Sequence, residues 1–142
     1  MGFPILSGIE KREVRKVLKT IIVLFTGVCL ESLGNVLLRK GMKEVGEVTS
    51  FSIPALFNIF IKGITNLTVI SGVALDAMFF ACFLIALSWT EVSVVLPLTA
   101  IGYVTTAIFA KIILHEEITA LRWAGTIAIV LGSIMVGKSG GS

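Results

Sequence analysis

Four long apolar runs divide the chain, and the first three are each long enough to cross a lipid bilayer. They extend over Val17–Leu38, Leu67–Ser88, Val92–Leu114 and, shorter than the others, Leu121–Val136. An α-helix rises about 1.5 Å per residue, so about 20 residues span a hydrocarbon core of about 30 Å. The connectors after the second and third runs are short, which predicts antiparallel neighbours. The pattern predicts an all-α integral membrane protein with four transmembrane helices.

The segment between the first two runs has an amphipathic pattern instead. Most of its apolar residues share one helical face, and Pro54 suits the first turn of a helix. The apolar positions are Leu56, Ile59, Phe60, Ile64 and Leu67. We therefore predict an interfacial amphipathic helix between transmembrane helices 1 and 2. A rival span over Ile53–Val73 would place Lys62 at mid-membrane and leave the rest of this region too short.

The composition agrees that lipid is the main solvent of this chain. It is 56% hydrophobic and 15% charged, whereas globular proteins carry about 25% charged residues. Its 142 residues suit one compact domain. We expect a single transmembrane domain over residues 1–137, opening with a basic segment over residues 1–16. Residues 138–142 are expected to form a flexible tail.

The net charge of +3 comes largely from a basic cluster just ahead of the first apolar run. Such a cluster suits a membrane surface and argues against nucleic acid as a partner. Its members are Lys11, Arg12, Arg15, Lys16 and Lys19. A cleaved signal peptide is the alternative, but the apolar run exceeds the usual length and no clear cleavage site follows it. We expect a retained first helix.

The orientation in the membrane is not decided by charge totals. With four spans, six Lys and Arg residues fall on each side of the membrane. The basic cluster before the first helix favours both termini in the cytoplasm. An equal count is also what a protein that inserts both ways would show, so dual topology stays open.

Glu31 lies well inside the first apolar run, where a carboxylate is costly. An acidic side chain at mid-membrane costs about 3 kcal/mol, and such groups usually face a bundle interior or a wet cavity. Asn35 follows four residues later and shares its helix face. We predict that Glu31 and Asn35 handle protons or substrate. The alternative is a neutral glutamic acid that only joins helices.

Asp76 is the second acid within an apolar run. Glu31 lies about 20 Å along the first helix from Leu18, and Asp76 about 18 Å from Ser88. In antiparallel helices the two carboxyls would lie near one level. Two carboxyls in a low-dielectric site cannot both ionise cheaply, so we expect one to hold a proton near neutral pH. Alternatively, Asp76 pairs with an amide or hydroxyl and never titrates.

The third apolar run contains two further candidates. Pro97 frees a backbone carbonyl and permits a kink, either where helices flex around a cavity or as a static packing bend. Tyr103, the only tyrosine, lies about two turns further on and points into a cavity or anchors packing. The sequence shows a single histidine and no metal-ligand spacing, nucleophile–base pair or phosphate loop. We therefore expect neither an enzyme nor a bound cofactor.

Two motifs resemble those of small multidrug resistance transporters. The string Glu31-Ser32-Leu33-Gly34, followed by Lys40, is similar to their first helix. The resemblance implies that Glu31 binds protons and substrate in competition. Gly125 and Gly132, seven residues apart, match the glycine heptad that forms dimers in that family. Leu98 stands where those exporters carry a tryptophan that stacks on substrate.

The second half resembles the EamA-type branch of the same drug/metabolite transporter superfamily. The strings that carry this resemblance are His115-Glu116-Glu117-Ile118-Thr119 and Arg122-Trp123-Ala124-Gly125. That branch includes paired small subunits that flip aminoarabinose-bearing undecaprenyl phosphate. Together the two resemblances cover about residues 17–137.

These observations predict a multi-pass transporter of the cell inner membrane. We expect it to move a small or amphipathic solute, coupled to protons through Glu31. We also expect a homodimer, or a heterodimer with a related four-helix protein. A flippase for a lipid-linked sugar is the second hypothesis, and a non-transporting assembly subunit of a membrane enzyme is the third.

Overall fold

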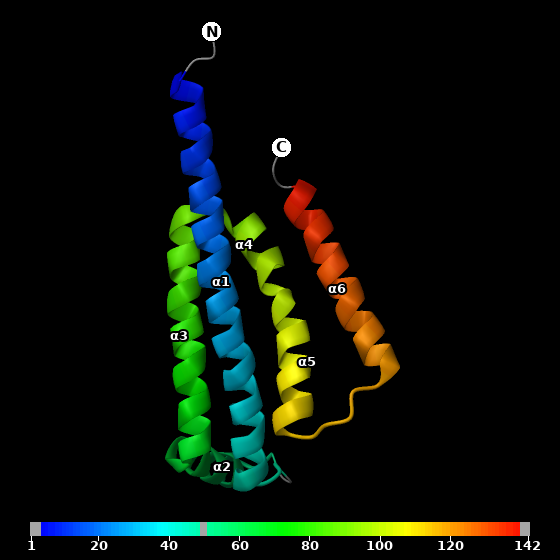
Figure 1. Ribbon diagram of the computed structural model, residues 1–142. Coiled ribbons are helices and arrows are strands. Elements are labelled where there is room, and N and C mark those ends of the chain that lie inside the picture. Colours follow the sequence, from blue (N-terminus) through cyan, green and yellow to red (C-terminus); the bar gives the residue numbers. More distant parts are fainter. Residues whose placement is uncertain (1–3, 49–50, 140–142) are drawn as a thin grey trace.

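The computed structural model describes residues 4–48 and 51–139, and nearly all of them are helical (Figure 1). No strand occurs in these two stretches. The helices are α1 (Pro4–Val45), α2 (Ile53–Thr65), α3 (Leu67–Trp89), α4 (Val92–Thr99), α5 (Ile101–Ile113) and α6 (Ala120–Ser139). Four are long and apolar enough to span a membrane when α4 and α5 are taken as one crossing. This confirms the predicted fold class, including a shorter apolar helix between the first two crossings.

The helices of the bundle alternate in direction, and both ends of the chain emerge on the same side (Figure 1). The hydroxyl oxygens of Thr20 and Thr90 lie 3.1 Å apart, at the turn between α3 and α4. The part of α1 that precedes Thr20 continues past the other helices (Figure 1), and side chains 12–19 are exposed. The expected basic segment is therefore part of a long helix, while residues 1–3 lie outside the described residues.

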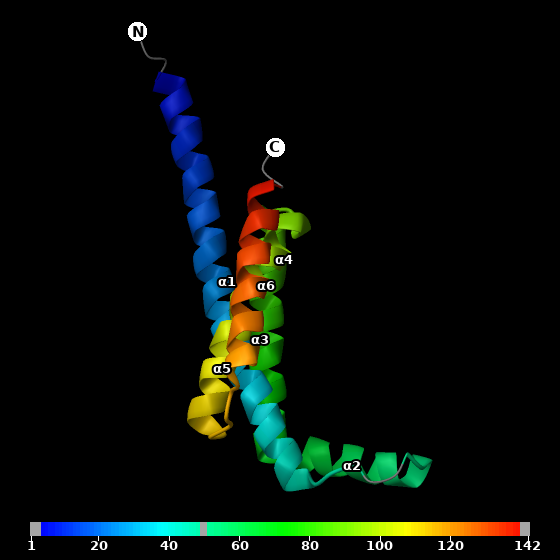
Figure 2. The same cartoon turned by 90° about the vertical axis from the view of Figure 1, so that its right-hand side faces the viewer.

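Helix α2 runs across the end of the bundle, away from α1 and α3 (Figure 2). Asn66 follows α2 in an extended conformation, and its side-chain oxygen accepts a hydrogen bond of 3.0 Å from the Val69 N–H at the start of α3. Its amide nitrogen donates to Glu44 of α1 over 3.0 Å. One residue thus ends α2, caps α3 and holds both against α1. The location of α2 at a membrane surface stays a prediction.

The closest packing in the molecule joins α1 to α3. Three glycines of α1, spaced seven residues apart, face α3 at points where the two helices leave no room for a larger side chain on α1. A Cβ at Gly27 would lie 2.9 Å from the Cβ of Cys82, and one at Gly41 would lie 2.9 Å from the Val69 nitrogen. A Cβ at Gly34 would lie 2.9 Å from the Gly72 oxygen. Small residues at regular spacing let two helix backbones approach closely in lipid.

The third crossing is interrupted at Ala100, between α4 and α5. Pro97 has no N–H, so the carbonyl of Ser93 cannot accept the usual helical hydrogen bond from this position. The chain instead makes two tighter turns: the Ala100 N–H donates to Pro97 and the Tyr103 N–H donates to Ala100, each over 3.1 Å.

Helix α6 packs loosely against the third crossing, α4 and α5, and diverges from it toward the α5–α6 connector (Figure 1). Most of its side chains are exposed, and Thr126 is its buried residue. It starts one residue before the predicted run and continues through Ser139, so Lys138 and Ser139 belong to the helix and not to the tail. Residues 140–142 lie outside the described part of the chain.

The buried core is small, as expected when lipid surrounds a bundle. Leu24 of α1, Ala86 of α3 and Val95 of α4 form one cluster, with Phe83 and Leu87 packed against it. Many large apolar side chains are exposed along every crossing. These surfaces suit contact with lipid or with another protein.

Candidate functional site

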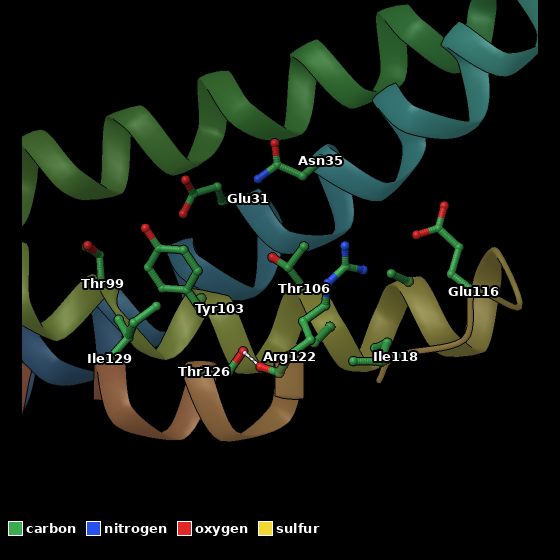
Figure 3. Close-up of a pocket in the computed structure, with 14 residues that line it drawn as sticks. Glu31, Asn35, Thr99, Tyr103, Thr106, Glu116, Ile118, Arg122, Thr126 and Ile129 are labelled. Atoms are coloured by element: carbon green, nitrogen blue, oxygen red, sulfur yellow. Dashed lines mark hydrogen bonds between the residues drawn. The ribbon is translucent and has the colours of Figure 1, made fainter. Parts of the chain in front are cut away.

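A cavity of about 730 Å³ lies between α1, α5, α6 and the connector that joins the last two helices. Its polar and charged side chains come from these four segments and from Thr99 at the end of α4, and Figure 3 shows them as sticks. They are Glu31, Asn35, Thr99, Tyr103, Thr106, Glu116, Arg122 and Thr126. The apolar remainder includes Ala107, Ala110, Ile118 and Ile129. The cavity is of the size that binds small solutes.

Glu31 enters this cavity from α1 because the residues around it fix α1 against α5. The neighbouring Ser32 is fully buried, and its hydroxyl is hydrogen-bonded to Thr105 of α5. Gly102 lies opposite, and a Cβ there would be 3.8 Å from a carboxylate oxygen of Glu31. Glu31 is partly buried and has no hydrogen bond or ion pair with any described residue.

The structure brings three of the predicted site residues together. Glu31 and Asn35 project from one face of α1, and Tyr103 projects from α5 into the same cavity (Figure 3). The side chains of Asn35 and Tyr103 also make no hydrogen bond within the described residues. Three polar groups are therefore available to a ligand.

Asp76 lies outside this cavity, between α1 and α3. Its Oδ1 atom is buried against Gly34 and has no hydrogen-bond partner in the described part of the chain. The Ser71 hydroxyl donates to the Thr68 carbonyl instead, and Asn35 does not pair with Asp76. Gly34, which meets Asp76, follows Glu31 by three residues of α1, so Asp76 contacts α1 close to the face that carries Glu31, although only Glu31 borders the cavity.

Glu116 closes the end of the cavity farthest from the chain termini. It lies in the α5–α6 connector, where His115 has a positive φ of 54°. One of its carboxylate oxygens accepts hydrogen bonds from Lys43 over 3.3 Å and from Arg39 over 3.4 Å. The hydrogen bonds from Lys43 and then Arg39 lower the pKa of Glu116, so it is ionised at neutral pH.

Arg122 is a site residue that the sequence pattern did not identify, because Arg122 contributed only to the charge count and to the string that resembles EamA-type proteins. It lies in the first turn of α6 and points into the cavity (Figure 3). Its guanidinium has no hydrogen bond or ion pair within residues 4–48 and 51–139. Its spacing of four and seven residues from Thr126 and Ile129 puts all three on one helix face, which was the available signal.

The two glycines predicted at a dimer interface lie on exposed parts of α6. Gly125 borders the cavity, and Gly132 does not. A Cβ at either position would meet nothing within 4 Å. Within the described residues, no neighbouring helix fills the space beside them.

A second cavity of about 390 Å³ lies toward the chain termini, between α1, α4 and α6. Its walls are mostly apolar, with Lys138 and Thr90 among its few polar residues. Pro97 and Leu98 line this cavity, whereas Thr99 and Gly102 line the larger one. The interruption between α4 and α5 therefore lies between the two cavities.

The comparisons with known proteins identify the family. The chain matches no curated protein and no solved structure. The model of the EamA-like transporter family matches residues 49–138, more than half of the chain, from the start of α2 to the end of α6. This segment contains the string from His115 to Gly125 and excludes Glu31. The chain is therefore a multi-pass membrane protein that belongs to the EamA-like transporter family, within the drug/metabolite transporter superfamily.

Proposed function

We propose that the protein transports a small or amphipathic solute across the cell inner membrane, coupled to protons through Glu31. The observation that carries this proposal is an unpaired carboxyl group within a membrane-spanning helix, facing a cavity of about 730 Å³. Membership in a transporter family supports transport itself.

The coupling follows from competition at one group. A charged carboxylate in this position is costly unless it meets a cation, hydrogen-bond donors or water. A proton and a solute that carries a donor or a positive charge would therefore exclude each other at Glu31. Asn35 and Tyr103 would hold the solute beside it by hydrogen bonds. Exchange of a proton for a solute then couples their movements.

Asp76 would act on this exchange from the contact between α1 and α3. Its buried oxygen lacks a partner, and a buried polar group without a partner is costly, more so when charged. Asp76 would therefore ionise reluctantly, and its negative charge, once formed, would oppose the ionisation of Glu31. It would not touch the solute, because it does not line the cavity.

A dimer would complete the cavity. Helix α6 forms one wall and exposes most of its surface, including the small residues Gly125 and Gly132. A second copy, or a related four-helix protein, would cover this face and shield the solute from lipid. Small residues at helix interfaces permit this close approach.

The test is transport by wild type and Glu31→Gln in proteoliposomes across mildly acidic to alkaline pH. A panel of cationic, zwitterionic and neutral solutes is applied with and without a proton gradient. We expect a solute flux that depends on the gradient in wild type and is abolished in the mutant. Equal, pH-responsive transport by the mutant would remove Glu31 from the mechanism. Asn35→Asp would serve as a second variant that perturbs the same cavity.

A second candidate function is the flipping of a lipid-linked sugar. The apolar cavity between α1, α4 and α6 favours it, because hydrocarbon would fit there while a head group occupied the polar cavity. Mass spectrometry of lipids that copurify with the protein separates the two functions. A stoichiometric polyprenyl phosphate lipid would favour the flippase, and its absence would favour the solute transporter.

A further inference from the structure

The large cavity holds two opposite charges that do not meet. Glu31 reaches it from α1 and Arg122 reaches it from α6, and no ion pair joins them (Figure 3). An arginine guanidinium remains charged in proteins and carries five N–H donors in a fixed fork. None of these donors is used within the described residues. The cavity therefore offers an unpaired cationic group as well as an unpaired carboxyl group.

The other charged group of the lining is already balanced. Glu116 accepts hydrogen bonds from Lys43 and Arg39, two cations of α1, and makes no ion pair with Arg122. Asp76 faces the α1–α3 contact and does not line the cavity. Among the described residues this leaves Glu31 and Arg122 to be neutralised by a ligand.

The two groups lie at different depths. Arg39, which pairs with Glu116 at the end of the cavity, follows Glu31 by eight residues of α1, or about 12 Å. Arg122 lies in the first turn of α6, next to the connector that carries Glu116. The guanidinium is thus nearer the membrane surface, and Glu31 lies deeper. Thr106 and Asn35 supply a hydroxyl and an amide along the same cavity.

We propose that the solute carries both a positive and a negative group, with the positive group at Glu31 and the negative group, a carboxylate or phosphate, at Arg122. This proposal rests on the proposed transport function and specifies its substrate class. A cation alone would pair with Glu31 and leave Arg122 unpaired, and an anion alone would do the reverse. A zwitterion of matching length satisfies both charges, and the arginine fork suits two-oxygen recognition of carboxylate or phosphate.

The test uses ω-amino carboxylates of increasing chain length as probes, each compared with the alkylamine and the alkyl carboxylate of the same length. Aminoalkyl phosphates of the same lengths distinguish phosphate from carboxylate as the preferred anion. Binding is followed by the fluorescence of Trp123, which follows Arg122 in α6, in a Trp89→Phe background. We expect one chain length to bind at least about tenfold more tightly than both matched single-charge probes.

Arg122→Gln should remove this preference and leave alkylamine binding unchanged, whereas Arg122→Lys should retain part of it. Lys111→Gln is the matched control, because Lys111 is an exposed cation near the same end of the bundle that does not line the cavity. Equal binding of all three probe classes, a preference that survives Arg122→Gln, or no binding by any probe would overturn the proposal.

These outcomes are independent of the test of proton coupling. If Glu31→Gln abolishes gradient-driven flux but Arg122→Gln does not change probe preference, the transport proposal stands and the zwitterion proposal fails. If the probe preference depends on Arg122 but no proton-coupled flux is found, the binding site stands and the transport proposal fails.

Discussion

Two helices of this protein carry glycines at a spacing of seven residues, and their surroundings differ completely. On α1, Gly27, Gly34 and Gly41 face α3, where an added Cβ would lie within 3 Å of other atoms. On α6, Gly125 and Gly132 face open space. The same sequence pattern therefore forms a close contact within the chain on α1, whereas on α6 it leaves a surface that no helix in the described part of the chain covers. Glycine spacing alone indicates a close helix contact, but not which helix fills it.

The largest expected effect is on the filled glycines. Gly34→Leu would force a side chain into the Gly72 carbonyl and the Asp76 carboxyl, so the free energy of unfolding should fall by about 3 kcal/mol or more. Thermal unfolding in detergent, followed by size-exclusion chromatography, measures this loss. Gly132→Leu is the matched comparison and should lose far less stability, because an added Cβ there meets nothing of this chain within 4 Å. Comparable destabilisation of both variants would mean that the two glycine rows are packed alike.

The next effect concerns the open glycines. Gly132→Leu should reduce crosslinking between protomers in membranes several-fold, because a bulky side chain would hold a partner helix away from α6. Single cysteines on the exposed face of α6, in a background without Cys29 and Cys82, report this contact. An unchanged dimer yield in this variant would place the interface on another helix.

A smaller effect is expected at Asp76, which lies in the contact between α1 and α3 next to Gly34. Asp76→Asn preserves the shape of a buried side chain that has no partner, so stability should change by less than about 1 kcal/mol. The pH of half-maximal transport should fall, because a negative neighbour of Glu31 is removed. A pH profile identical to that of wild type would show that Asp76 only fills space between α1 and α3.

The smallest effect is expected at the ion pairs that tie the α5–α6 connector to α1. The hydrogen bonds from Lys43 and Arg39 lower the pKa of Glu116 in the folded protein. The stability that these ion pairs give to the connector is therefore complete above the pKa of an unfolded glutamate, about 4.3, and is lost as pH falls through the lower folded value. A spin-label distance between Lys40→Cys and Ile118→Cys should lengthen only in that acidic range. Glu116→Gln should show the longer distance at all pH values, and a constant distance in wild type would contradict this role.

Much of the fold could be predicted because it depends on the lengths of apolar runs. The four crossings and α2 follow from hydropathy and helical period, since backbone hydrogen bonds must be satisfied within each helix in lipid. The position of Glu31 and Asn35 on the wall of one cavity also follows, because residues four apart share a helix face. These are local properties of the chain.

The site was less predictable because it depends on how helices are rotated about their axes. Counting residues placed Glu31 and Asp76 at similar depth, but it could not show that only Glu31 borders the cavity. Arg122 was counted by its side of the membrane, although its face is set by the packing of Thr126. Rotation is decided by contacts such as those of the α1 glycines, whose partner helix the sequence does not name.

The interruption at Ala100 lowers the free-energy cost of bending the third crossing between α4 and α5. A continuous helix must break a backbone hydrogen bond to bend, but Pro97 has already removed that bond from the third crossing. Residues on its two sides contribute mainly to different cavities: most of the α4 lining belongs to the apolar cavity and most of the α5 lining to the charged one, while Thr99 and Ile101 cross over. A bend at residues 97–101 would therefore alter the walls of both cavities at once, and no hydrogen bond to the Ser93 carbonyl from Pro97 would have to break for it. The hydrogen bond that such a bend would otherwise break is already absent from the folded helix.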